Sequence, residues 1–244
     1  MIRLDRWLVT LGLGSRSQVQ KLIRSGAVTL DGMPMKDPSH SCDERTQRIA
    51  MRGQEIDGRL MRHVMLHKPA GLLTAARDKK QPTVMDLLPE TYASIGCMPV
   101  GRLDKDTTGL LFLTCDGELN HRLLAPARHV DKVYIAEVDG PLNQTHVDAF
   151  AAGLHLGDFD AQSALLTILR TDDASAEAEV TVHEGKFHQI KRMFEAVGRT
   201  VTKLHRASFG PLELDPALPE GQWRELTDDE VRALYQAADM EVPV

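Results

Sequence analysis

The sequence predicts an α+β protein in which strand-like segments are interspersed with a few amphipathic helices. Short runs of apolar and β-branched residues, bounded by Gly, Pro and Asp, recur along the chain as expected of strands. Other segments repeat apolar residues three or four positions apart behind a capping residue, as expected of helices. With 42% hydrophobic and 26% charged residues, the 244 residues can bury a sizeable core in one or two domains. The order of strands within a sheet does not follow from these patterns.

Composition excludes several classes of protein. No apolar stretch approaches the roughly 20 residues that a membrane-spanning helix needs. The N-terminus carries charges where a signal peptide needs its apolar region. The cysteines are odd in number and widely spaced, which fits neither a disulfide framework nor a zinc ligand set: Cys42, Cys97 and Cys115. We therefore expect a cytoplasmic protein that does not bind membranes.

Charge is distributed unevenly along the chain. The whole sequence carries −6, but residues 1–62 hold 11 basic and 7 acidic side chains, a net +4. The first 30 residues hold five basic side chains and one acidic side chain. Phosphate binding depends on local rather than total charge. The N-terminal segment is therefore the predicted contact surface for a nucleic acid.

Two helices and a strand are predicted in this N-terminal segment. The first helix has leucines at helical spacing and ends at Gly12 or Gly14. The second begins at Ser15, with Gln18 completing a capping box, and residues 27–32 follow as a strand running into an Asp-Gly turn. A basic helical face is often only a solvated face, so charge alone does not decide for RNA. Three basic residues lie off the apolar stripe of the second helix and are expected to face outward: Arg16, Lys21 and Arg24.

The central stretch of the chain is residues 101–113, with the sequence GRLDKDTTGLLFL. Its apolar run 110–113 predicts a buried strand, so Asp104 lies in a loop at the mouth of a core strand. A carboxylate there can be desolvated while a substrate still reaches it, although a turn-capping Asp has the same pattern. The spacing partly matches a calcium loop, but Cys115 occupies the position of the bidentate Glu, which excludes calcium.

Apolar periodicity and capping residues predict the remaining elements. Strands are expected at 63–71, 132–138, 163–170, 178–182 and 200–209. Helices are expected from Asp116 to Leu124, around Phe150, at 190–197, and after the capping residue Thr227.

The segment 184–194, EGKFHQIKRMF, combines an apolar helix stripe with two basic residues. Lys191 and Arg192 lie in the N-terminal half of this helix, against its dipole, which indicates either an anionic partner or a solvated face. His183 and His188 are five positions apart. On a helix that spacing turns the two rings about 140° away from each other, which excludes a zinc helix.

The central stretch resembles the Gly-Arg-Leu-Asp motif of pseudouridine synthases, whose Asp is the nucleophile. Four further segments are similar to motifs of this family: the Lys-Pro-x-Gly opening at 68–71, Lys-x-Tyr at 132–134, Glu-Gly-x-x-His-Gln-x-Lys-Arg-Met at 184–193, and the closing strand at 200–210. The resemblance covers nearly the whole chain and is greatest to the RsuA-type group, which acts on ribosomal small-subunit RNA.

The N-terminal segment resembles the S4 RNA-binding module at residues 3–5, 15–16 and 26–32. The resemblance implies an S4-like RNA-binding domain over 1–58 and a pseudouridine synthase catalytic domain over 63–240. It also implies that the catalytic domain is built on a mixed, largely antiparallel central sheet flanked by helices.

The same resemblance implies roles for individual residues. Asp104 would be the nucleophile, and Lys191 would keep it ionised, because an opposite charge within about 4–6 Å favours the charged form. Tyr134 would stack on an extruded uracil, with its hydroxyl able to mediate a proton transfer. Arg102 would help to displace the base, and Leu204 would form an apolar wall. Contacts to substrate or RNA are also expected of Gln189, Arg192, Arg3, Arg16, Lys21 and Arg24.

The predicted reaction is the isomerisation of one uridine in 16S ribosomal RNA. The N1–C1′ bond breaks, the base rotates, and C5 bonds to C1′. Because this needs no redox change or group donor, we expect no cofactor and no metal. The expected partner is ribosomal RNA, with 16S favoured, or a small-subunit assembly particle, and the protein is expected to be a monomer. Whether Asp104 attacks C1′ or C6, or assists elimination to a glycal, does not follow from the sequence.

Three alternatives remain. A synthase of the same family acting on 23S ribosomal RNA would share all these motifs. A non-catalytic S4-type RNA-binding assembly factor would explain the N-terminal module, but not the presence of Asp104, Tyr134 and Lys191 in the family's positions. A hydrolase using Asp104 with Asp106 is disfavoured, because adjacent loop carboxylates do not by themselves flank a glycosidic bond.

Overall fold

The computed structural model describes residues 1–243 and has the predicted α+β fold. The chain forms two compact units. One contains Met1–Arg62 with Leu88–Cys97, and the other contains His63–Leu87 with the chain from Met98 onward. Each unit has its own hydrophobic core. No helix among the described residues is long and apolar enough to cross a membrane.

The first unit contains three helices and a small antiparallel sheet. The capping box predicted at Ser15 and Gln18 is present, and the predicted Asp31-Gly32 turn joins two strands with both residues at positive φ. Its helices are α1 Leu4–Thr10, α2 Arg16–Arg24 and α3 Glu90–Ser94. Its sheet has the order β3-β2-β5-β6, with β2 Val28–Leu30, β3 Met33–Met35, β5 Ile49–Met51 and β6 Gln54–Ile56, and β1 Ile2–Arg3 pairs with β4 Ser41–Cys42.

Leucines at helical spacing in α1 and the apolar stripe of α2 form the core of this unit. Trp7 is fully buried and donates a hydrogen bond from Nε1 to the carbonyl of Gly58, 2.8 Å away. Asp5 is also buried. It accepts two hydrogen bonds from Arg3, which hold the pKa of its carboxyl well below the usual range, and a third from Gln20.

The second unit is organised on one large sheet, with strand order β13-β14-β10-β15-β9-β7-β17. Every pairing in it is antiparallel except that of β15 with β9, which confirms the mixed, largely antiparallel sheet. The strands are β7 His63–Lys68, β8 Met98–Pro99, β9 Thr108–Thr114, β10 Lys132–Asp139, β13 Leu165–Thr171, β14 Ser175–Val182, β15 Val201–Phe209, β16 Leu212–Glu213 and β17 Trp223–Glu225. A separate hairpin pairs β11 Leu154–His155 with β12 Asp160–Ala161.

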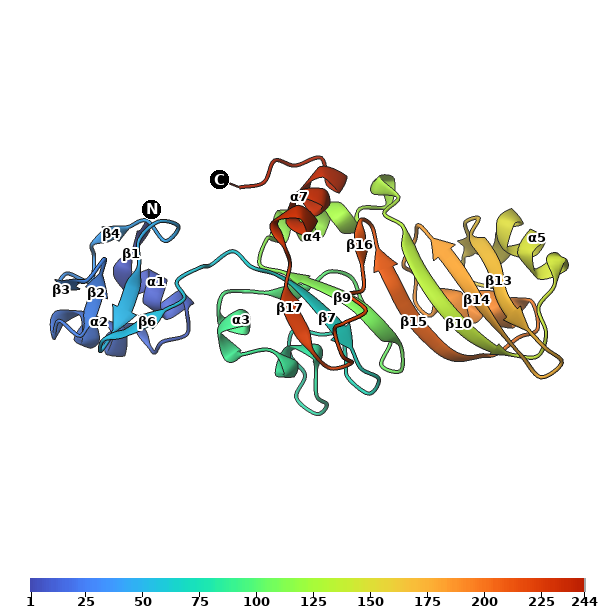
Figure 1. The fold of residues 1–244 in the computed structure, drawn as a ribbon, viewed down its shortest axis with the longest axis horizontal. Helices are drawn as coiled ribbons and strands as arrows, with labels where there is room; N and C mark the ends of the chain where they lie inside the picture. The colour runs from blue at the N-terminus through green and yellow to red at the C-terminus, as the bar shows by residue number, and fades with distance from the viewer. Residues whose placement is uncertain (244) are drawn as a thin grey trace. The chain divides into compact units, whose positions relative to one another are not determined.

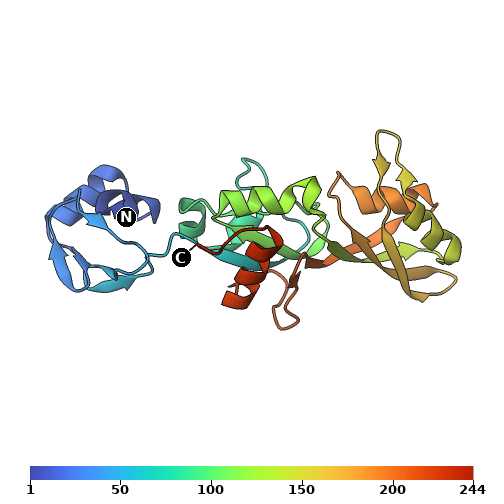
Figure 2. The same ribbon diagram turned by 90° about the horizontal axis from the view of Figure 1, so that it is seen from above.

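Helices lie against both halves of this sheet (Figures 1 and 2). Leu123 and Tyr235 place α4 Gly117–Leu124 and α7 Asp228–Ala237 in one core with Phe112 of β9. In the other half, α5 Gln144–Ala152 meets α6 Gln189–Ala196 through the rings of Phe150 and Phe194, with centroids 4.9 Å apart. The predicted caps Asp116 and Thr227 begin α4 and α7. The two remaining short helices are 3₁₀ turns, Val84–Leu87 and Pro126–Arg128.

The two halves of the sheet join where β15 runs parallel to β9. His205 pairs with Thr108, and Arg206 pairs with Gly109. Gly109 has φ of +104°, and a Cβ added there would lie 2.3 Å from the backbone oxygen of Arg206. The close approach of the two strands therefore requires a glycine.

We expect Gly109→Ala to lower the free energy of unfolding by roughly 2–4 kcal/mol, because the new methyl group both overlaps Arg206 and occupies a left-handed backbone. Urea unfolding measures the change. Gly117→Ala is the matched control, since Gly117 is at the start of α4 and an added Cβ meets no atom within 4 Å. Equal midpoints for the two variants would contradict the role given to this strand contact.

Candidate active site

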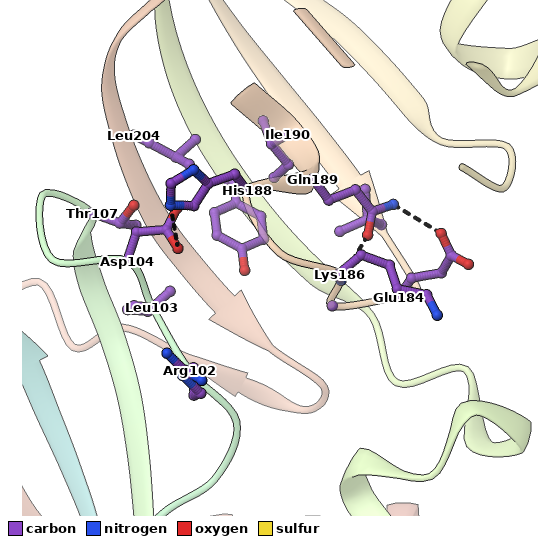
Figure 3. A pocket seen from close by; sticks show the side chains of 13 residues that line it. Arg102, Leu103, Asp104, Thr107, Glu184, Lys186, His188, Gln189, Ile190 and Leu204 are labelled. Atoms are coloured by element: carbon purple, nitrogen blue, oxygen red, sulfur yellow. Dashed lines mark hydrogen bonds and ion pairs between the residues drawn. The ribbon is translucent and has the colours of Figure 1, made fainter. Parts of the chain in front are cut away.

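The loop that carries Asp104 leads directly into the buried strand β9, as predicted. The Asp104 side chain is 25% exposed, so it is partly desolvated and still accessible. The amide of Thr107 donates to the carbonyl of Asp104 at 3.2 Å, which closes a turn around the carboxylate. Figure 3 shows the carboxylate directed into a pocket formed with residues from the loop before α6.

A buried ammonium group anchors this loop. Lys68, the last residue of β7, is fully buried, and its Nζ donates to the carbonyls of Pro69, Lys105 and Thr107 at 2.9, 3.2 and 2.8 Å. Two of these carbonyls flank Asp106, so one side chain holds the loop on both sides of that residue. Burial lowers the pKa of Lys68 to about 8. In the sequence Lys68 is recognisable only as part of the Lys-Pro-x-Gly motif, which does not predict this contact.

Two cationic or ionisable side chains approach the Asp104 carboxylate. Lys191 Nζ lies 3.5 Å from its Oδ2, and His188 Nε2 lies 3.5 Å from its Oδ1. Lys191 also hydrogen-bonds both oxygens of Asp106, at 2.6 and 2.8 Å, and this lowers the pKa of Asp106. The ammonium expected beside Asp104 is therefore shared between two carboxylates, and Asp106 is the nearer partner.

His188 was absent from the predicted site residues. It has φ of 51° and ψ of 28°, a left-handed conformation that is uncommon for a residue with a side chain. Helix α6 begins only at Gln189, so residues 184–188 form a loop. The rotation of about 140° expected between His183 and His188 holds only on a helix, and this segment is not helical. The available signal for His188 was its place in the 184–193 motif.

The pocket brings together residues from four separate segments of the chain. Arg102 and Asp104 come from one loop, Tyr134 from β10 and Leu204 from β15. His188 and Gln189 complete the set at the start of α6 (Figure 3). Tyr134 and Leu204 are more than nine-tenths buried, so their apolar surfaces form walls beside the carboxylate.

Gln189 lines the pocket mainly as a support for the loop. Its Nε2 donates to Glu184 at 2.9 Å, and its Oε1 accepts from the amide of Lys186 at 3.1 Å (Figure 3).

Thr107 lines the same pocket, and its buried hydroxyl has no hydrogen-bond partner within residues 1–243.

Arg192 is not among the residues that line the pocket. Its guanidinium contacts the carbonyl of Leu156 and the carboxylate of Asp158, and lies 4.8 Å from the ring centroid of Phe159. Neighbouring positions on a helix point about 100° apart, so the side chain of Arg192 is directed away from that of Lys191, whose Nζ lies 3.5 Å from Asp104. The contact of Arg192 with the substrate stays a prediction, and its guanidinium is already bound to the loop between β11 and β12.

The four basic residues predicted to contact RNA lie in the first unit. Arg16, Lys21 and Arg24 are exposed, as expected from their place off the apolar stripe of α2. Arg3 is half-exposed, but its guanidinium is bound to Asp5.

A larger cavity of about 630 Å³ adjoins the pocket and shares Arg102 and Tyr134 with it. Phe209 contributes an apolar surface to its wall. Lys132 and Arg206 also line it while being buried, and burial lowers the pKa of Lys132 to about 8. The carboxylate pocket therefore opens beside a space with basic and apolar walls, which suits a ligand much larger than a single base.

Most of the chain matches models of known protein families. A family model described as RNA pseudouridylate synthase matches residues 62–196, and a model of the S4 domain matches residues 2–47. A solved structure described as a pseudouridylate synthase is 34% identical, with a TM-score of 0.67, over 96% of this chain and 100% of that one.

Curated relatives match over nearly their whole length. The chain is 42% identical to ribosomal small subunit pseudouridine synthase A of Pseudomonas aeruginosa, over 94% of this chain and 99% of the relative. It is 40% identical to the uncharacterised RNA pseudouridine synthase YtzG of Bacillus subtilis, over 96% and 99%. The small-subunit enzyme of Vibrio cholerae is 35% identical, over 96% and 100%.

The Lys68 contact predicts a particular dependence of stability on pH. Folding lowers the pKa of Lys68 from 10.5 to about 8, so between these values the unfolded chain binds more protons than the folded chain. The contribution of Lys68 to the free energy of unfolding therefore rises as the pH increases from 8 to 10. Relative to Lys68→Met, the wild-type free energy of unfolding is expected to gain about 1–2 kcal/mol across that range.

Urea unfolding at several pH values measures this difference, with Lys203→Met, a change at an exposed lysine of β15, as the control. Parallel curves for the wild type and Lys68→Met would show that Lys68 does not titrate in this window.

Proposed function

This chain belongs to the RNA pseudouridylate synthase family, of the RsuA type, and on that premise we propose that it isomerises one uridine of 16S ribosomal RNA with Asp104 as the catalytic carboxylate. The chain is a pseudouridine synthase that acts on uridine in RNA. The observation that carries the proposal for Asp104 is its position in a pocket with apolar walls, beside Lys191 and His188.

The reaction sets out what the pocket has to do. The N1–C1′ bond breaks, a C5–C1′ bond forms, C5 loses a proton and N1 gains one, so the atoms balance without an added reagent. A carboxylate can act as nucleophile or as base, and it is needed in its ionised form. The ammonium of Lys191, 3.5 Å away, supports that state of Asp104.

Tyr134 and Leu204 are suited to hold a uracil that has left the RNA stack. A flipped base is bound by stacking on aromatic or apolar side chains. Tyr134 offers its ring from β10, and Leu204 lies one strand away on β15. Arg102 is exposed and lines both the pocket and the adjoining cavity, which supports a role in displacing or replacing the base.

The 16S assignment rests on the relatives. Two of them, 42% and 35% identical over nearly their whole length, are named as small-subunit enzymes. We propose ribosomal RNA or a small-subunit assembly particle as substrate, a monomeric enzyme, and action in the cytoplasm. Activity on 23S RNA and a purely RNA-binding role are the outcomes that the experiment below distinguishes.

We also propose that residues 1–58 form an RNA-binding domain and residues 63–240 the catalytic domain. The exposed basic side chains of α2 support the first assignment, since phosphate contacts use exposed Lys and Arg. Arg3 would contribute less to phosphate binding, because Asp5 already binds its guanidinium.

Asp104→Asn should abolish pseudouridine formation, because the amide cannot act as an anionic nucleophile or base. Pseudouridine is mapped in 16S and 23S RNA from cells that lack the protein and from cells supplied with wild type or Asp104→Asn at equal levels. One 16S site is expected to disappear and to return only with the wild type. A missing 23S site would move the assignment to the large subunit, and a site restored by Asp104→Asn would refute the catalytic role.

Lys191 and Asp106 should differ in their effects on rate. We expect Lys191→Met to lower kcat/KM at least about 100-fold, since it removes the charge beside Asp104, and Asp106→Asn to lower it less than about tenfold. Release of tritium from RNA labelled at uridine C5 measures the rate, and Lys203→Met should leave it unchanged. Equal losses in the first two variants would mean that Lys191 acts chiefly through Asp106.

A further inference from the structure

One phenylalanine stands apart from the other five. Phe112, Phe150, Phe194 and Phe209 are fully buried, and Phe159 lies under the guanidinium of Arg192. Phe187, in contrast, is 71% exposed. A single exposed apolar side chain is ordinary on a protein surface, so its exposure alone indicates nothing.

Phe187 lies next to a residue of the catalytic pocket. Its ring stacks on the ring of His188, with centroids 3.8 Å apart and planes at 17°. His188 in turn lines the catalytic pocket and lies 3.5 Å from Asp104. Because one ring face of Phe187 is covered by His188, the exposed surface belongs to the opposite face and the edges. A stack of two rings thus starts at the catalytic carboxylate and ends on an open aromatic face.

The loop that carries this stack is held in place by its neighbours. Gln189 bonds both the side chain of Glu184 and the amide of Lys186, which spans the loop on either side of Gly185. His188 has a left-handed backbone and is followed at once by α6. The open face is therefore preorganised, so a ligand that stacks on it meets little ordering cost.

The charges around this face favour a nucleic acid over a protein. Lys186 is exposed in the same loop, and Arg102 is exposed across the pocket. The nearby acids have partners, since Glu184 accepts from Gln189 and Asp106 from Lys191. Aromatic faces next to Lys and Arg are the usual platforms for unpaired bases. One phenyl ring offers far less apolar area than a stable protein interface needs.

We propose that Phe187 is a stacking subsite for a nucleobase adjacent to the target uridine. Extrusion of the uridine deprives its neighbours of a stacking partner, and the open face of Phe187 would replace it just outside the pocket. This inference rests on the proposed function, because it assumes that a flipped uridine occupies the pocket beside Asp104. It adds a contact outside that pocket which helps to determine how RNA is held.

The test uses 2-aminopurine, a base whose fluorescence reports stacking, in the ribosomal RNA fragment that contains the mapped uridine. It is placed in turn at four positions, namely the two nucleotides before the uridine and the two nucleotides after it. Binding is measured with the full chain carrying Asp104→Asn, so that no turnover occurs. At one position, stacking on Phe187 is expected to change the fluorescence. Phe187→Leu and Phe187→Ala should abolish that change and raise Kd about tenfold, whereas Phe187→Tyr should retain it.

Leucine is the matched control, because it keeps an apolar side chain without an aromatic face. Leu169→Ala removes another exposed apolar side chain, on β13, and should change neither Kd nor fluorescence. Turnover at saturating RNA, measured without Asp104→Asn, should change less than about threefold in Phe187→Leu, since the ring acts on binding. Thermal unfolding of each variant confirms that the fold is intact.

The proposal would be overturned if the Asp104→Asn protein gave the same Kd and the same fluorescence with and without Phe187→Leu, at all four positions of 2-aminopurine. The proposed function fails separately, if the wild type forms no pseudouridine in the fragment. A fluorescence change that depends on Phe187 in such an inactive protein would keep the stacking contact and reject the catalytic assignment.

Discussion

The close parallel pairing of β15 with β9 is the constraint on which the site depends. Gly109 allows the backbone of Arg206 to approach where any side chain would overlap it. On one side of this junction, β9 begins directly after the loop of Asp104. On the other side, β15 carries Leu204 and pairs with β10, which carries Tyr134. The carboxylate and the walls of its pocket therefore face each other across a single strand contact.

Two lysines stabilise this arrangement in different ways. Lys68 is buried and its Nζ donates to three carbonyl groups, so it fixes the path of the loop. Lys191 lies between the carboxylates of Asp104 and Asp106 and supplies a counter-charge to both. Sharing the ammonium with Asp106 holds it in place from one side while it remains within reach of Asp104.

Substrate binding extends beyond the pocket. The adjoining cavity has buried basic groups and apolar surfaces, and the open ring of Phe187 lies next to His188 on the loop before α6. These features suit a polyanion with exposed bases. A net charge of −6 does not oppose RNA binding, because phosphate binding depends on local charge and the first 62 residues carry a net +4.

The sequence by itself determined most of the helices and long strands, and through the family resemblance it predicted several site residues. The capping boxes at Ser15 and Thr227, the Asp31-Gly32 turn and the buried run of β9 follow from interactions between residues only a few positions apart. The predicted boundaries agree with the structure to within a few residues. Family resemblance selected Asp104 and Tyr134, whose side chains line one pocket.

Only the tertiary structure decided which side chains share partners. Lys68 reaches carbonyls 37 and 39 residues away, and Lys191 reaches Asp106 across 85 residues. Such contacts depend on strand register and on the direction of each side chain, neither of which is encoded in local periodicity. For the same reason the sequence could not separate Lys191, which contacts Asp104 and Asp106, from Arg192, which contacts the loop between β11 and β12. The turn that directs His188 to Asp104 likewise exists only because the surrounding fold holds its backbone in a left-handed conformation.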